Sequence, residues 1–578
     1  MRLIFRYIKK RKLLLFLNVI FAFSFIFAEI GIPFFFGRMI DTGINQRNPQ
    51  AILSGFWIIV FVSVLSALGT LLLVVTCSKI ATQAVYEIRK DLFEHVMKFS
   101  VREVEHFSIS SLITRTNADA YQLMLFMQTL LRSALFAPAM LVVSLVLVFK
   151  TSISLSWTIL VTLPIVVLGA FLIFKYSEPL SMRLQKLTDN INKILREDLN
   201  GIRVIRSFNR QKQEEVRFDQ ENRNYQGVSR RLFTMMRSAY PTFYFVMNIA
   251  TLLIYYFGSL FISQNTLSLG SLVTFTEYLF HCMMSVFVLC DVFMMYPRAS
   301  VSAKRIEEVL NMEPSIVSSS DQTLDSVSSI EFKNVSFAYP NSTEHSLHNV
   351  SFQAKKGQKV AIVGATGSGK STLIRLINRF YDPTSGEILI NGQNIQNYSL
   401  KSLRQNVAMI SQRAHMFTGT IRDNVTFANP HATDEEIDRA LSLSLSKNFV
   451  EAKPDQLEDW ISEEGSNLSG GQKQRLSIAR AICAKSNLYI FDDSFSALDL
   501  ATDLKVRQSL APMVKDSLFF IVAQRISTIM DCDQILLLDH GNLVACGTHD
   551  ELYKTSELYR QIVLSQMNEQ EALSYGRS

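Results

Sequence analysis

The sequence predicts an α-helical polytopic membrane domain with six transmembrane helices and long cytoplasmic extensions, followed by an α/β P-loop domain. Three observations support this prediction. The chain has 578 residues, of which 48% are hydrophobic, 41 are Phe and only 19% are charged. Uncharged stretches of about 20 residues, the length that spans a bilayer, all lie before residue 300. After residue 330, short apolar runs alternate with helical patterns around a glycine-rich motif.

Charge is distributed unevenly along the chain. Residues 1–300 carry 31 Lys and Arg against 18 Asp and Glu, whereas residues 301–578 carry 27 against 33. The cations of the first half alternate with long apolar runs, so we exclude a nucleic-acid partner. The composition also excludes a disordered, collagen-like or disulfide-stapled chain. The six Cys lack paired metal-ligand spacing and are expected to be free thiols: Cys77, Cys282, Cys290, Cys483, Cys532 and Cys546.

The predicted membrane helices cover residues 13–36, 52–76, 133–149, 155–174, 242–262 and 271–296. A basic N-terminus followed by an apolar run is also the pattern of a signal peptide. Here the apolar run is too long, no small-residue cleavage site follows it, and five more spans do. We therefore interpret it as a retained first helix.

Loop charge predicts how these helices are oriented. Six Lys and Arg lie in the first 12 residues, six lie between Lys79 and Arg115, and 14 lie in residues 175–240. Of the other three connections, the first holds only Arg38 and Arg47, the second only Lys150, and the third holds no Lys or Arg. Because Lys and Arg concentrate in cytoplasmic loops, both termini are predicted to be cytoplasmic.

The two long basic connections show apolar residues at three- and four-residue spacing, so the membrane helices are predicted to continue well into the cytosol. A Ser-rich stretch after Val309 is typical of a linker. The predicted domains are a transmembrane domain over residues 1–310, a linker over 311–329 and a nucleotide-binding domain over 330–578.

A P-loop is predicted after an apolar strand at residues 360–363 and before a helix at 371–380. Its glycines let backbone N–H groups wrap phosphates, and the helix N-terminus adds a favourable dipole. Lys370 is expected to reach the terminal phosphates, and the Ser371 hydroxyl to ligate Mg²⁺. The predicted phosphate-binding residues are Gly364, Ala365, Thr366, Gly367, Ser368, Gly369, Lys370, Ser371 and Thr372.

Four further elements accompany the P-loop. Asp492 ends an apolar strand, where a carboxylate for Mg²⁺ is expected. Gln412 lies between the P-loop and a Leu-Ser-Gly-Gly-Gln segment. Tyr339 lies 25 residues before Gly364 and could stack on adenine. The Leu-Ser-Gly-Gly-Gln segment, called the signature below, comprises Leu468, Ser469, Gly470, Gly471 and Gln472.

With these motifs in this order, the whole chain resembles the ABC transporter family, specifically exporters that fuse six membrane helices to one nucleotide-binding domain. The resemblance implies an ATPase that uses ATP and Mg²⁺ in the bacterial cytoplasmic membrane. It also implies that two nucleotide-binding domains form a head-to-tail sandwich, in which each ATP lies between the P-loop of one chain and the signature of the other.

The resemblance implies further roles for single residues. Tyr339 stacks on adenine, Gln412 binds Mg²⁺ and contacts the membrane domain, and residues 496–499 communicate between the two sites. The turns near residues 105–112 and 207–213 act as coupling helices. One departure is Ser111, where relatives usually have Gly before the Leu.

Two residues depart from the family's hydrolytic pattern at the same ATP site. Asp493 stands where hydrolytic members place Glu, and Gln524 where they place His. Asp is one methylene shorter, and a displacement of about 1 Å at a reacting centre can lower a rate roughly 10²-fold. Gln donates a hydrogen bond but cannot take up a proton as imidazole does. Tolerated variation is the alternative; because both changes fall on one site, we predict a site that binds ATP and hydrolyses it slowly.

The intact signature residues Ser469, Gly470, Gly471 and Gln472 are then expected to act on a partner's ATP. This asymmetry favours a heterodimer with a second half-transporter over a homodimer. The partner is expected to carry the Glu and the His, together with an altered signature.

Ionisable residues in the last predicted span share one helix face. Glu277, His281 and Asp291 lie at about 0°, +40° and −40° around the helix axis, and Glu29 of the first span is a further candidate. One interpretation is an acidic cavity wall that prefers cationic amphiphiles. The alternative is interhelical hydrogen bonding, or pairing with cations such as Arg132.

The sequence thus predicts one half of an ATP-driven exporter of the multidrug type, which moves hydrophobic or amphiphilic compounds out across the membrane. Two alternatives remain at this stage. One is a homodimeric lipid or peptide exporter with slow ATPase sites. The other is an ATP-gated channel or sensor.

Overall fold

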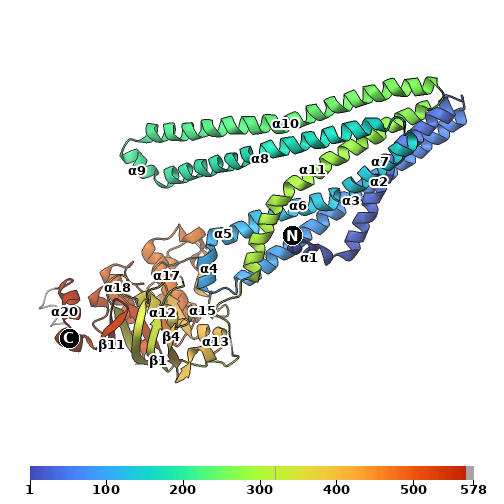
Figure 1. Cartoon of the computed structure of the whole chain (residues 1–578). Coiled ribbons are helices and arrows are strands. Elements are labelled where there is room, and N and C mark those ends of the chain that lie inside the picture. The colour runs from blue at the N-terminus through green and yellow to red at the C-terminus, as the bar shows by residue number, and fades with distance from the viewer. Residues whose placement is uncertain (319, 341, 568–578) are drawn as a thin grey trace. The chain divides into compact units, whose positions relative to one another are not determined.

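The computed structural model describes residues 1–318, 320–340 and 342–567, with Ala170 and Phe174 described by their backbone only. The chain forms two compact units (Figure 1). The first unit comprises Met1–Met97 and Ile109–Met312, and the second comprises Lys98–Ser108 and Glu313–Ser578. A short segment of the N-terminal half therefore belongs to the second unit.

The described residues of the first unit form helices and their connections, with no β-strand. Six helical segments of 33 to 53 residues are long and apolar enough to cross a membrane. Four are single helices, whereas Lys12–Ile44 and Ile109–Thr151 are runs of consecutive helices. Because about 20 residues suffice to cross a bilayer, the prediction of six spans with long extensions is confirmed. The helices are α1 (Arg2–Lys9), α2 (Lys12–Met39), α3 (Pro49–Val96), α5 (Ile109–Thr114), α6 (Ala120–Ser133), α7 (Phe136–Thr151), α8 (Trp157–Asn200), α9 (Ile202–Ser207), α10 (Gln211–Ser263) and α11 (Leu269–Asn311), with π-helical turns at Ile40–Ile44 and Arg115–Asp119.

Within this unit, α8 and α10 run side by side and are joined at one end by α9, whereas α2 packs on α3 and α7 packs on α11 (Figure 1). The backbones of α2 and α11 touch where Gly37 faces Gly270. A Cβ on Gly37 would lie 2.6 Å from the Gly270 carbonyl oxygen. The Asp41 carboxylate then accepts hydrogen bonds from the Gly270 N–H at 2.8 Å and from the Ser268 hydroxyl at 2.5 Å. Asp41 therefore holds the beginning of α11 against the end of α2.

The second unit is built on a ten-stranded sheet with the order β5-β4-β1-β2-β12-β11-β3-β10-β9-β6. The five strands β11, β3, β10, β9 and β6 run parallel to one another. The strands are β1 (Ser329–Phe337), β2 (Leu347–Lys355), β3 (Lys359–Val363), β4 (Ser385–Ile390), β5 (Gln393–Asn394), β6 (Val407–Ile410), β9 (Leu488–Asp492), β10 (Leu518–Val522), β11 (Gln534–Asp539) and β12 (Asn542–Gly547), with a separate pair of β7 (Gly419–Thr420) and β8 (Trp460–Ile461).

Strand alternation places the core on both faces of the sheet. Ala361 and Phe491 belong to the apolar cluster on one face, whereas Val360 and Ile490 belong to the cluster on the other. Because both faces are buried, these strands read as continuous apolar runs in the sequence. The helices that accompany the sheet are α4 (Val101–Phe107), α12 (Lys370–Ile377), α13 (Leu400–Gln405), α14 (Ile421–Val425), α15 (Asp434–Leu443), α16 (Lys447–Glu451), α17 (Gly470–Cys483), α18 (Leu500–Val514), α19 (His549–Thr555) and α20 (Glu557–Leu564).

The helix predicted after the P-loop is shorter than expected. It ends at Ile377, because Arg379 adopts a left-handed conformation with φ 50°. The Phe380 N–H then donates to the Arg375 carbonyl oxygen at 2.9 Å, which closes a Schellman-type end.

Candidate nucleotide-binding site

The order of the parallel strands brings the predicted nucleotide residues together. The carboxyl ends of β3, β10, β9 and β6 lie at one edge of the sheet, and the segment after each strand supplies one part of the site. The P-loop follows β3, Gln524 follows β10, and Gln412 follows β6. Asp492 is the last residue of β9, and Asp493 comes directly after it. This edge of an open α/β sheet is where ligands commonly bind.

The P-loop requires glycine at two positions. Gly364 has φ 155°, and a Cβ on it would lie 2.1 Å from the Leu538 carbonyl oxygen. Gly369 has φ 101°, and its Cβ would lie 2.8 Å from the Ser346 carbonyl oxygen. Both positions combine a left-handed backbone with a close neighbouring chain, which only glycine accommodates.

Donor groups of the P-loop are available for an anion. The Ser368 hydroxyl is buried and has no hydrogen-bond partner among the described residues. The Lys370 ammonium donates to the Gly364 and Ala365 carbonyl oxygens at 2.9 and 2.7 Å. Burial lowers the pKa of Lys370, while the charges of Asp493 and Asp492 oppose this shift. A buried hydroxyl, a lysine and a helix N-terminus fit a bound triphosphate.

Tyr339 is anchored to the helix that follows the P-loop. Its hydroxyl lies 3.1 Å from the Thr372 hydroxyl and accepts a hydrogen bond from Arg375 at 3.2 Å. Its ring meets the Tyr381 ring edge-on, with centroids 5.4 Å apart. These contacts fix the ring that the sequence predicts as the adenine platform.

The two adjacent carboxylates at the end of β9, Asp492 in the strand and Asp493 just after it, have different environments. Burial raises the pKa of Asp492, and the charge of Asp493 raises it further, although Arg375 and Lys370 act in the opposite direction. Asp493 is 7% exposed and adopts a left-handed conformation with φ 48°. Asp tolerates this conformation better than most residues.

One oxygen of Asp493 accepts two hydrogen bonds from amide side chains. The Gln412 Nε2 donates to Asp493 Oδ2 at 3.0 Å, and the Gln524 Nε2 donates to the same oxygen at 2.8 Å. The Asp493 N–H also donates to the Val522 carbonyl oxygen at 2.9 Å. Both residues that depart from the hydrolytic pattern, Asp493 and Gln524, thus bond to each other.

The signature lies at the beginning of α17. Ser469 is its N-cap residue: the Ser469 Oγ accepts from the Gln472 N–H at 3.3 Å, and the Gln472 Oε1 accepts from the Ser469 N–H at 2.9 Å. Gly470 is exposed, and a Cβ on it would meet open space. From inside α17, the buried Gln474 donates to the Ser411 carbonyl oxygen at 3.3 Å, next to Gln412. The beginning of α17 is thus an open, capped helix end.

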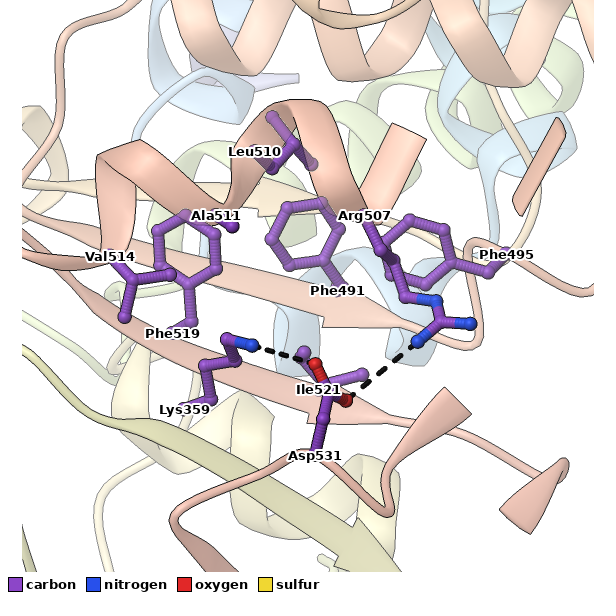
Figure 2. A pocket seen from close by; sticks show the side chains of 10 residues that line it. All are labelled: Lys359, Phe491, Phe495, Arg507, Leu510, Ala511, Val514, Phe519, Ile521 and Asp531. Carbon is purple, nitrogen blue, oxygen red and sulfur yellow. Dashed lines mark hydrogen bonds and ion pairs between the residues drawn. The ribbon is translucent and has the colours of Figure 1, made fainter. Parts of the chain in front are cut away.

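The segment after Asp493 is held to the sheet by aromatic packing. Phe495 stacks on Phe491 with ring centroids 5.1 Å apart, and both rings line a small pocket under α18 (Figure 2). Figure 2 shows Lys359 and Arg507 pointing toward Asp531 from two sides; Lys359 Nζ lies 2.7 Å from Asp531 Oδ2 and Arg507 NH1 3.7 Å from Oδ1. The residues predicted to communicate between sites, Ser496, Ala497, Leu498 and Asp499, end at the N-cap of α18.

In the first unit, the structure brings three of the four predicted cavity residues near one another. His281 Nε2 lies 3.6 Å from Glu29 Oε2, a contact that joins α11 to α2. Glu277 is one helical turn earlier than His281 on α11. Asp291 lies ten residues beyond His281 and is exposed. The contact between His281 and Glu29 favours the interhelical interpretation for that pair.

Sequence reasoning did not select Arg375 and Tyr381, which contact Tyr339, and it gave Glu105 only as part of a predicted coupling turn, not as a partner of Tyr381. Arg375 lies one helical turn after Ser371, and this spacing could have placed it beside the site. Nothing in the sequence pairs Glu105 with Tyr381, because they are 276 residues apart.

Known proteins match both units of the chain. Residues 15–286 match the ABC transporter transmembrane region, and residues 347–496 match the ABC transporter domain. The ABC transporter ATP-binding protein YfiB of Bacillus subtilis is 34% identical over 562 residues, which cover 97% of each chain. The chain belongs to the ABC transporter family.

Two further comparisons describe the type of ABC transporter. An ATP-dependent lipid A-core flippase of Haemophilus influenzae is 30% identical over 543 residues, which cover 94% of this chain and 92% of the flippase. The solved structure of a bacterial Atm1-family ABC exporter with ATP bound shares the fold, with a TM-score of 0.80, 23% identity and 98% coverage of both chains. This ABC transporter carries its membrane and ATPase domains fused in one multi-pass chain, with the fold of that exporter.

Proposed function

We propose that this ABC transporter is the slow-site half of a heterodimeric exporter. Its own P-loop site binds Mg²⁺-ATP and hydrolyses it slowly, while its signature completes a fast site on the partner. The observation that carries the proposal is the pair of amide donors on Asp493 Oδ2.

A general base must be free to take a proton from water, and such assistance contributes about 10²–10⁴-fold to a rate. Asp493 Oδ2 already accepts hydrogen bonds from Gln412 and Gln524. The side chain is also one methylene shorter than the Glu of hydrolytic members. Gln524 supplies no proton acceptor in place of an imidazole. The arrangement therefore favours retention of ATP over turnover.

The remaining residues fit the cofactors. Lys370, Ser368 and the P-loop N–H groups would hold the phosphates, and Tyr339 the base. Mg²⁺, when bound, neutralises phosphate charge; Ser371, Gln412 and Asp492 supply only oxygen ligands, as this ion prefers. Because the Gln412 Nε2 is engaged by Asp493, its Oε1 is the atom left for the metal.

The signature supports the other half of the proposal. Ser469, Gly470, Gly471 and Gln472 form an open helix N-terminus, which attracts phosphate. The 14-residue helix α17 behind them is intact and capped. The chain thus retains what a partner's ATP requires, although its own hydrolytic residues are altered.

For the membrane domain, we propose transport of hydrophobic or amphiphilic compounds out of a bacterial cell. The excess of Lys and Arg in the N-terminal segment and in two connections supports cytoplasmic termini. Glu277, His281 and Asp291 give α11 a polar face for cationic compounds. The similarity to lipid A-core flippases favours a second candidate, a lipid-like amphiphile.

Nucleotide occupancy tests the proposal. We expect a photoreactive ATP analogue, added to the purified complex under turnover and then cross-linked, to remain on this chain as triphosphate and to appear on the partner as diphosphate. A matched pair of variants, Lys370→Met at the P-loop and Lys359→Met at the other end of β3, should respectively abolish and retain the label. Absence of triphosphate on this chain, while the partner is labelled, would refute the slow-site assignment.

A further inference from the structure

The segment Lys98–Ser108, which belongs to the second unit, is fixed there by one side of α4. The Glu103 carboxylate accepts from the Ser100 N–H at 2.8 Å and from the Ser315 N–H at 3.2 Å. Glu103 is only 4% exposed; burial raises its pKa, but the hydrogen bonds from Ser100 and Ser315 outweigh burial and lower it overall. This side of α4 is therefore held to the chain that follows α11.

The opposite side of α4 contacts a different element. Glu105 lies about 200° around the helix from Glu103. Its Oε2 accepts a hydrogen bond from the Tyr381 hydroxyl at 3.0 Å. Tyr381 is 5% exposed, and burial raises the pKa of its hydroxyl, as does the bond to Glu105. The hydroxyl therefore stays protonated and donates to Glu105 throughout the physiological pH range.

Tyr381 continues the chain of contacts to the predicted adenine platform. Its ring meets the Tyr339 ring at 84°, with centroids 5.4 Å apart. Phe337 packs against both rings, at 5.0 Å from Tyr339 and 5.4 Å from Tyr381. In a close-packed cluster of three rings, one ring does not shift without the others.

Arg375 adds an electrostatic contact to the same cluster. It donates to the Tyr339 hydroxyl at 3.2 Å. Although burial lowers its pKa, the interactions with Tyr339, Tyr381 and Glu105 raise it overall. Burial raises the pKa of Asp492, and the charge of Arg375 opposes this rise. The positive charge of Arg375 thus interacts with both α4 and the carboxylate predicted to bind Mg²⁺.

We propose that Tyr381 and Glu105 form a positioning link that makes α4 respond to the base of ATP at Tyr339. The link rests on the proposed function, because it requires adenine to stack on Tyr339. Stacking restricts the Tyr339 ring, the packed Tyr381 ring is restricted with it, and its hydroxyl holds Glu105. Since α4 is joined by short connections to α3 and α5, the base, and not only the phosphates, affects the chain that enters the membrane domain.

The test measures hydrogen–deuterium exchange of residues 98–108 in the full-length protein in lipid nanodiscs, together with ATP affinity. Mg²⁺-ATP should slow exchange in α4, whereas Mg²⁺-tripolyphosphate, which lacks a base, should not. In Tyr381→Phe the ring remains and the bond to Glu105 is lost. We expect the ATP-induced slowing to fall about tenfold, the scale of one hydrogen bond to a charged group, with ATP affinity retained.

The matched control is Tyr398→Phe, which removes the hydroxyl of another buried tyrosine that donates to the Ile390 carbonyl oxygen at 3.1 Å. It should respond as the unmodified protein does. The link is overturned if Tyr381→Phe keeps the full response, if tripolyphosphate gives the same response as ATP, or if Tyr398→Phe loses it equally. Should Tyr381→Phe fold poorly, Glu105→Ala at the exposed end of the bond repeats the test. Failure of the unmodified protein to bind ATP would instead refute the proposed function, and the affinity measurement identifies that case.

Discussion

Asp493 is flanked by amide side chains because of its strand's place in the sheet. Strand β9 lies between β10 and β6, so Gln524 and Gln412 reach the end of β9 from its two sides. Both donate to Asp493 Oδ2, at 2.8 and 3.0 Å. A pair of amide donors holds a carboxylate in place, but neither amide accepts a proton from it. The chemistry of the site therefore depends on two residues at neighbouring strand ends.

At the same site, the raised pKa of Asp492 predicts a pH-dependent stability. A carboxyl whose folded pKa lies above its unfolded value of about 3.9 favours the folded state most below that value, and this contribution is lost as pH rises through the folded pKa. Asp492→Asn should therefore raise the melting temperature of the nucleotide-free protein by a few degrees near pH 7.5. The gain should vanish near pH 3.5.

Thermal unfolding of the full-length protein across this pH range checks the prediction. Asp539→Asn, at the end of the neighbouring parallel strand β11, is the control and should show no gain. In the same samples, Asp492→Asn should lose the stabilisation by Mg²⁺-ATP that the unmodified protein shows. An equal rise in melting temperature at pH 7.5 and pH 3.5 would contradict the claim that burial of the Asp492 carboxylate raises its pKa.

At the scale of elements, the crossing of α2 and α11 depends on two glycines. A Cβ on Gly270 would lie 2.0 Å from the Gly37 carbonyl oxygen, and backbone atoms cannot move aside as a flexible side chain does. Small residues at such crossings let membrane helices approach closely. The Asp41 hydrogen bonds to Ser268 and Gly270 form only at this separation.

We expect Gly270→Ala to separate these helices and to destabilise the protein by roughly 2 kcal/mol or more, a size typical of overpacking. Gly227→Ala is the control, because a Cβ there meets nothing within 4 Å on the exposed side of α10. It should be neutral or stabilising by up to about 1 kcal/mol, since Ala favours helix. Thermal unfolding of the two variants in nanodiscs measures the difference. Equal stability of both would show that the crossing is not close-packed.

At the scale of the whole molecule, the sequence predicted what hydrophobic runs and motif spacing determine. The six spans follow from the length of the uncharged stretches, and the strands before Gly364 and up to Asp492 follow from apolar runs beside the motifs. The bond between Asp493 and Gln524 did not follow, because strand order, which brings β9 next to β10, is a long-range property. The bond between Glu105 and Tyr381 was missed for the same reason, because the two residues are 276 positions apart. The end of α12 at Ile377 was missed for a local reason, since a non-glycine residue, Arg379, takes a left-handed conformation just after it.

The polar face of α11 predicts which compounds the transporter prefers. If Glu277 and Asp291 attract cations, the double variant Glu277→Gln and Asp291→Asn should lower the transport of cationic amphiphiles about tenfold, because charges of this kind contribute on the order of 1 kcal/mol each. The transport of neutral amphiphiles should fall less than about twofold. Uptake into inverted vesicles measures both classes. Glu94→Gln, on the extension of α3, is the control. An equal loss for both classes would mean that these acids hold helices together.

The central claim is that the two ATP sites of the complex differ, with the signature of this chain serving the fast one. The most direct measurement compares the ATPase rates of Ser469→Arg and Asp493→Asn in the same purified complex. The account predicts that Ser469→Arg lowers the rate about 10²-fold or more, because a transition-state contact at the fast site is lost. Thr433→Arg, at the N-cap of α15, controls for the loss of a helix cap. Asp493→Asn should keep more than about half of the activity, since a slow site gains little from its base. If Asp493→Asn silences the ATPase as fully as Ser469→Arg does, the two sites are equivalent, and a homodimer becomes the better description.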